Sequence, residues 1–139
     1  MTPQFNNLIT IPCGSEKDFF RFWLIFLTPI HSPSPKPLDI AVSILYTRHV
    51  LSKTVLDKDL LDDIVLGKSV REQLAKEYDI TRAQLNVLIS RLRTSGFLIG
   101  DRINPKYIPN YKDEDKFKML IRFDIRNNET VGKESHTNG

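Results

Sequence analysis

The sequence predicts a mainly helical fold with a small β-hairpin, an α+β arrangement in which the helices supply most of the core. Two consecutive segments within residues 69–95 repeat apolar residues at helical spacing and are separated by only a few residues. Two apolar segments with strand-like patterns follow, at residues 97–103 and 116–125. With 139 residues, of which 40% are hydrophobic, the chain is long enough to bury one core without disulfides or metal ions.

An aromatic helix is expected over about residues 16–27. Ser15 and Asp18 form a capping arrangement, in which the serine hydroxyl accepts a hydrogen bond from an N–H group of the first turn. The aromatic positions at helical spacing, predicted to face the core, are Phe19, Phe22, Trp23 and Phe26. Other apolar residues leave few polar positions around this helix. We therefore also expect residues 19–27 to contact a partner, either in a homodimer or on another protein.

Residues 31–37 contain three prolines and are predicted to form a stiff connector that is neither regular helix nor central strand. Helices are expected over residues 38–51, beginning near Pro37, and from about Asp57 to a stop at Gly67. The aspartates of the second helix are expected on a solvated face; they are Asp57, Asp59, Asp62 and Asp63. We divide the chain into an N-terminal extension with its connector (1–36), a main domain (37–126) and a disordered polar tail (127–139).

The next two helices each begin at a capping box, Ser69 with Glu72 and Thr81 with Gln84. The first is expected to end near Tyr78, and Gly96 is expected to end the second. A pair of capped helices joined by a short turn is a helix-turn-helix. The residues predicted to be buried together are Leu74, Leu85, Leu88, Ile89, Leu92, Phe97 and Ile99.

The stretch SVREQLAKEYDITRAQLNVLISRLRTSGFLI (residues 69–99) resembles the winged helix-turn-helix family, and the likeness extends over about residues 37–125. The resemblance implies a winged helix-turn-helix domain, here with an extra N-terminal aromatic helix. In that family the second helix enters the major groove and the wing contacts the flanking DNA. The short chain, rich in Lys, Asn and Ile, also resembles small phage-encoded proteins.

The DNA contacts that the resemblance implies lie on the second helix, at the start of the first helix and in the wing. They are Arg82, Asn86, Ser90, Arg93 and Thr94, then Ser69, and then Lys106, Tyr107 and Lys112. Arginine suits guanine edges or phosphates, and asparagine suits adenine edges. The acidic residues 113–115 depart from a strongly basic wing.

The distribution of charge favours a polyanionic partner. Residues 1–67 hold 6 basic and 7 acidic side chains, whereas residues 68–126 hold 13 basic and 8 acidic ones. We therefore expect double-stranded DNA as the partner and a role as a transcriptional or replication regulator, encoded by a phage or a bacterium. The alternative is a phage virion or other assembly protein that uses a winged helix as a docking scaffold. The expected location is the cytoplasm, or the host cytoplasm or virion if the chain is phage-encoded.

No pattern in the sequence points to catalysis, a metal ion or a cofactor. His31, His49 and His136 are scattered without metal-ligand spacing, and Cys13 is the only cysteine. Glycine-rich phosphate loops and nucleophile motifs are absent from the sequence. The most apolar stretch, residues 19–30, is interrupted by Arg21 and is shorter than the ~20 apolar residues of a membrane helix. We therefore expect a non-enzyme that does not contact a membrane.

Overall fold

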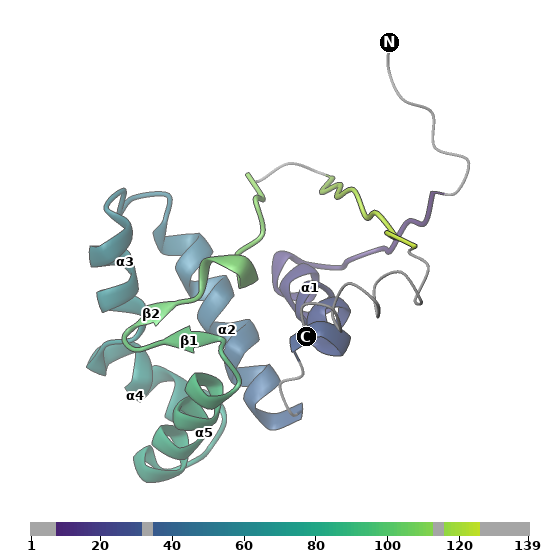
Figure 1. Ribbon diagram of the computed structural model, residues 1–139. Helices are drawn as coiled ribbons and strands as arrows, with labels where there is room; N and C mark the ends of the chain where they lie inside the picture. Colours follow the sequence, from purple (N-terminus) through teal and green to yellow (C-terminus); the bar gives the residue numbers. More distant parts are fainter. Residues whose placement is uncertain (1–7, 32–34, 113–115, 126–139) are drawn as a thin grey trace, which may run out of the picture. The chain divides into compact units, whose positions relative to one another are not determined.

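The computed structural model describes residues 8–31, 35–112 and 116–125, and the chain divides into two units, Met1–Pro109 and Asn110–Gly139 (Figure 1). In the described part, all helices and strands lie in the first unit. They are α1 (Glu16–His31), α2 (Pro35–Leu51), α3 (Lys58–Val65), α4 (Lys68–Glu77), α5 (Arg82–Thr94), β1 (Leu98–Ile99), β2 (Arg102–Ile103) and the short 3-10 helix η1 (Pro105–Tyr107). The predicted α+β class, mainly helical with a small antiparallel sheet, is confirmed at this level. The predicted disordered tail, residues 127–139, lies outside the described residues.

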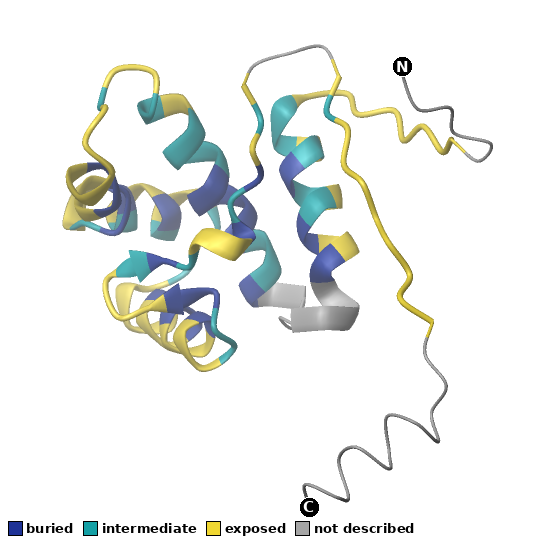
Figure 2. Cartoon of the chain, turned by 45° about the horizontal axis from the view of Figure 1, so that its top comes forward, coloured by how far each residue is buried: buried dark blue, intermediate teal, exposed yellow. Residues whose placement is uncertain are grey.

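Helix α2 is the central helix of the first unit, and it packs against α1, α3 and α5 (Figure 1). Six consecutive residues, 40–45, are buried, so this part of α2 is covered on every side. A helix that is apolar around its whole circumference is stable only inside a core. Figure 2 shows that the buried residues gather between the helices, whereas the outward-facing residues are exposed.

Helix α1 begins as predicted but buries a different face. The Ser15 Oγ atom accepts a hydrogen bond from the Asp18 N–H at 3.1 Å. Phe20, Leu24 and Leu27 are buried, whereas Phe22 and Phe26 are 40% and 43% exposed. The prediction that Phe22 and Phe26 face the core is therefore wrong. Because α1 packs against α2 through one narrow face, only part of its apolar circumference can be covered.

The prediction of a non-helical connector over residues 31–37 is also wrong where the structure describes it. His31 belongs to α1, and α2 begins at Pro35, two residues before the predicted start. Prolines are compatible with a first helical turn because the N–H groups of that turn have no intrahelical partner. The intervening residues 32–34 lie outside the described part.

Helices α4 and α5 are joined by residues 78–81, which confirms the predicted pair of helices and short turn. The Ile80 N–H binds the Ala75 carbonyl and the Asp79 N–H binds the Lys76 carbonyl, which is the Schellman arrangement. Asp79, with φ of 51°, occupies the left-handed position that glycine usually takes. This turn sets the direction in which α5 leaves α4.

The predicted hairpin between residues 97–103 and 116–125 is wrong. The antiparallel pair is β1 with β2, in which Leu98 pairs with Ile103 and Ile99 with Arg102 across a two-residue turn at Gly100. The described residues 116–125 contain no strand. Ile99, predicted to be buried, is 60% exposed, and Leu98 is buried in its place. The other six residues of the predicted core are buried as expected.

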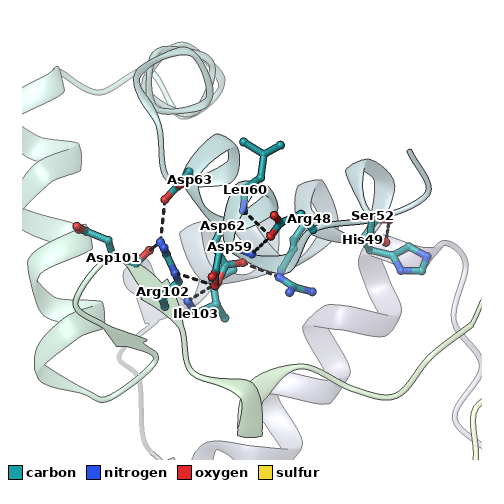
Figure 3. A network of polar contacts seen from close by, with 11 residues as sticks. Arg48, His49, Ser52, Asp59, Leu60, Asp62, Asp63, Asp101, Arg102 and Ile103 are labelled. Atoms are coloured by element: carbon teal, nitrogen blue, oxygen red, sulfur yellow. Dashed lines mark hydrogen bonds and ion pairs between the residues drawn. The ribbon is translucent and has the colours of Figure 1, made fainter. Parts of the chain in front are cut away.

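A polar network holds α3 against α2 and β2 (Figure 3). Asp62, only 5% exposed, accepts hydrogen bonds from Arg48 Nε at 2.9 Å and from the Ile103 N–H at 3.2 Å. Arg102 donates to Asp63 at 2.7 Å and lies 3.4 Å from Asp59. The prediction of a solvated acidic face is therefore wrong for Asp62, whose buried carboxylate links three elements.

Leu88→Ala should lower the free energy of unfolding by about 2–5 kcal/mol, because it removes a buried side chain and leaves a cavity. Urea unfolding of the variant measures the change. Val87→Ala is the matched control, since Val87 is the adjacent residue on α5 and is 53% exposed. Equal losses in the two variants would contradict the assignment of the buried face.

Asp62→Ala should cost about 3–5 kcal/mol, because it leaves the Arg48 guanidinium and the Ile103 N–H without their partner in a buried position. Asp63→Ala, on the same helix, breaks an exposed ion pair and should cost less than about 1 kcal/mol. Denaturant titration of both variants gives the comparison. A similar small cost in both would show that the Asp62 network contributes little to stability.

Candidate nucleic-acid interface

Helix α5 has one buried and one exposed face. Leu85, Leu88, Ile89 and Leu92 are buried at i, i+3, i+4 and i+7, as their spacing predicts. The helix begins at the predicted capping box, in which Thr81 Oγ1 accepts from the Gln84 N–H at 3.1 Å and Gln84 Oε1 accepts from the Thr81 N–H at 2.8 Å. Because the cap fixes the first turn and the leucine face fixes the rotation, the directions of the outer side chains are determined.

The predicted contact residues of α5 all lie on its exposed side; they are Arg82, Asn86, Ser90, Arg93 and Thr94. The first four follow one another at intervals of four, four and three residues, which places them in one row along the helix. The Thr94 hydroxyl donates to the Ser90 carbonyl at 3.2 Å. The structure thus brings these polar side chains onto one face, while their contact with DNA stays a prediction.

The arginines of this row make only weak exposed contacts with acidic neighbours. Arg82 lies 3.9 Å from Glu72, and Arg93 Nη2 lies 3.8 Å from Asp101. Arg93 Nε also donates to the Gly100 carbonyl at 3.1 Å, which joins the end of α5 to the hairpin turn. Exposed ion pairs of this kind contribute about 0–1 kcal/mol, so an incoming phosphate or base can replace the carboxylates at low cost.

Arg71 of α4 also contacts the polar row of α5, and the sequence did not predict this. Its Nε donates to the Leu66 carbonyl at 2.8 Å, and its Nη1 donates to Asn86 Oδ1 at 3.1 Å. Arg71 therefore connects the end of α3 to the exposed face of α5. The sequence carries no signal for this contact, because Arg71 and Asn86 lie on different helices and meet only through the angle of the turn.

The start of α4 differs from the prediction. The helix begins at Lys68 with Gly67 as its N-cap, and no side chain caps it, so the predicted Ser69–Glu72 capping box is wrong. A Cβ atom at Gly67 would lie 2.8 Å from the Asp63 carbonyl oxygen, which explains glycine at this close approach. Lys68 and Ser69 are exposed beside N–H groups that no side chain caps. This arrangement suits an anion such as a phosphate.

The residues predicted as wing contacts differ in burial and belong to both units. Lys106 is exposed, with Nζ 5.9 Å from the centre of the Tyr107 ring. Tyr107 is only 2% exposed, so its ring belongs to the core and is not on a contact surface. Its ring packs edge-on against Phe97, and its carbonyl accepts from Trp23 Nε1 at 2.7 Å.

Lys112 is exposed and belongs to the second unit. There Lys112, Lys116 and Lys118 line one hollow together with Tyr111 and Phe117. Lysines interleaved with aromatic rings are a combination that suits nucleic acid, because the lysines attract phosphate and the rings stack on bases. All of the residues that line this hollow belong to the second unit.

Two further findings concern metal ions and membranes. Within the described residues, no three His, Cys, Asp or Glu side chains are grouped so that they could hold a metal ion. None of the helices in the described part is long and apolar enough to cross a membrane.

Comparison with protein-family models, with curated proteins and with solved structures finds no match to this chain.

Burial raises the pKa of the Tyr107 phenol above its ordinary value of about 10. Above about pH 10 the unfolded chain releases this proton while the folded protein still holds it, so the free energy of unfolding should fall as the pH rises further. Urea unfolding between about pH 9 and about pH 11 measures this fall, and Tyr107→Phe should reduce it. No reduction in Tyr107→Phe would contradict the assignment.

Proposed function

We propose that the protein binds double-stranded DNA in the manner of a winged helix-turn-helix protein and acts as a regulator of transcription or replication. The observation that carries the proposal is the row of Arg82, Asn86, Ser90 and Arg93 on the exposed face of α5. The opposite face of the same helix is buried in the core, so this row is presented on a rigid element. A major groove accommodates an α-helix, and Arg and Asn side chains carry donors that distinguish base edges.

The charges around the row support the same proposal. Residues 68–94, which comprise α4, the turn and α5, hold six basic and three acidic side chains. Lys68 and Ser69 are exposed at the start of α4, and on this proposal they contact a phosphate on one side of the groove. The β1–β2 hairpin directly follows α5, in the chain position of a wing, although it is short and its turn contains Asp101.

A role in assembly is the second candidate, and the exposed apolar face of α1 favours it. Phe22, Ile25 and Phe26 are each at least 40% exposed and follow i, i+3, i+4 spacing, which places them on one side of the helix. In the second unit, Leu120, Phe123 and Ile125 are also exposed. Contiguous exposed apolar side chains are typical of protein-protein contacts. On this proposal the helices serve as a rigid scaffold and DNA is not bound.

DNA binding is tested by titrating labelled duplexes at two or three salt concentrations. The wild-type protein should bind duplex DNA more tightly than a Kd of about 10⁻⁴ M at physiological salt. Arg82→Ala should weaken binding to a preferred sequence by about 1–3 kcal/mol and relax preference at one base pair. Lys112→Ala should weaken binding to all sequences alike and lower the salt slope by about one unit.

The control is Lys58→Ala, which removes one exposed positive charge from α3, a helix that contributes no side chain to the proposed interface. It should leave both the sequence preference and the salt slope near their wild-type values. If the wild-type protein does not bind duplex DNA even at low salt, the proposal of DNA binding is contradicted and the assembly role is favoured.

A further inference from the structure

Arg71 links the Asn86 side chain to the backbone at the end of α3. The Arg71 Nε atom donates to the Leu66 carbonyl at 2.8 Å, while Nη1 donates to Asn86 Oδ1 at 3.1 Å. Because a guanidinium group is planar and its N–H directions are fixed, a contact to the backbone at one end sets the direction of the contact at the other. Arg71 is itself half-buried, which further restricts its movement.

The orientation of the Asn86 amide determines what it offers to a ligand. Since Oδ1 is directed at Arg71, the Nδ2 amino group is directed away from it and presents hydrogen-bond donors. Arg82, one turn earlier, adds a guanidinium whose only described ion pair is the 3.9 Å contact with Glu72. The N-terminal half of the row is therefore rich in donors, and one lone pair of the Asn86 Oδ1 atom is engaged by Arg71.

We infer that Arg71 is a positioning residue that fixes the donor side of Asn86 outward, so that α5 recognises guanine in the major groove. Guanine presents two acceptors there, N7 and O6, whereas adenine presents one acceptor and one donor. A free asparagine suits adenine because it offers an acceptor and a donor together; an asparagine whose oxygen is bound to Arg71 better matches guanine. This inference rests on the proposed DNA binding and goes beyond it by naming the base.

The test compares three alternating duplexes of about 24 base pairs each, d(GC), d(IC) and d(AT), as probes for the full-length protein. Inosine keeps N7 and O6 of guanine but lacks the 2-amino group, so d(IC) resembles d(GC) in the major groove and d(AT) in the minor groove. The protein should bind d(GC) and d(IC) with similar Kd values and d(AT) about tenfold more weakly.

Two variants test the role of Arg71. Arg71→Lys keeps the positive charge but cannot bind Leu66 and Asn86 through one planar group, and Asn86→Ala removes the amide itself. In both, the ratio of the d(AT) Kd to the d(GC) Kd should fall toward one, while the Arg71→Lys salt slope stays at the wild-type value. Arg91→Lys, a conservative change at an exposed arginine of α5 outside this contact, should leave the ratio unchanged.

Each result has a definite consequence. Equal binding of d(AT) and d(GC) by the wild-type protein, or an unchanged ratio in Asn86→Ala, would overturn the inference while leaving DNA binding in place. Binding of d(IC) as weak as that of d(AT) would place recognition in the minor groove and would also overturn it. Failure to bind any of the three duplexes would contradict the proposed function itself and this inference with it.

Discussion

The buried carboxylate of Asp62 is the interaction on which the arrangement of the first unit depends. It lies in α3, accepts from Arg48 of the central helix α2, and accepts from the backbone of β2 at Ile103. A buried charge is tolerated only when its partners are in place, so the positions of three elements are fixed together. Arg102, next to Ile103, adds exposed contacts to Asp59 and Asp63 of the same helix. The end of α3 and the short hairpin are thereby held on the same core.

Short connections between α3, α4 and α5 link the Asp62 network to the candidate interface. Gly67 allows α4 to begin directly after α3, and Arg71 in α4 binds back to the Leu66 carbonyl. The four-residue turn with Asp79 sets α5, and the leucine face of α5 is buried against the core that α2 supplies. Arg82, Asn86 and Arg93 therefore stand on a helix whose axis and rotation are both determined. Because the helix that carries these side chains is already ordered, binding would not have to order its backbone.

Features that depend on residues close together in the sequence were predicted correctly. Features that depend on contacts between residues far apart in the sequence were not predicted. The Thr81–Gln84 cap, the leucine face of α5 and the stop at Gly96 follow from spacing within a few residues, and all three are present. The exposure of the α5 polar row follows from the same spacing. In contrast, burial of Asp62 and Tyr107 depends on Arg48 and Phe97, which lie at least ten residues away. Residues 116–125 carry a strand-like pattern, but a strand needs a partner, and β1 pairs with the much closer β2 instead.

The proposed DNA-binding surface is the exposed face of α5. Nuclear magnetic resonance of isotope-labelled protein, with a duplex of about 24 base pairs added stepwise, tests this claim most directly. The largest shifts should occur at the side-chain signals of Arg71, Arg82 and Asn86 and at the backbone amides of Lys68 and Ser69, while the signals of Phe22 and Phe26 in α1 should stay unchanged. Shifts confined to the Phe22–Phe26 face of α1, or none on α5 at saturating DNA, would contradict this claim.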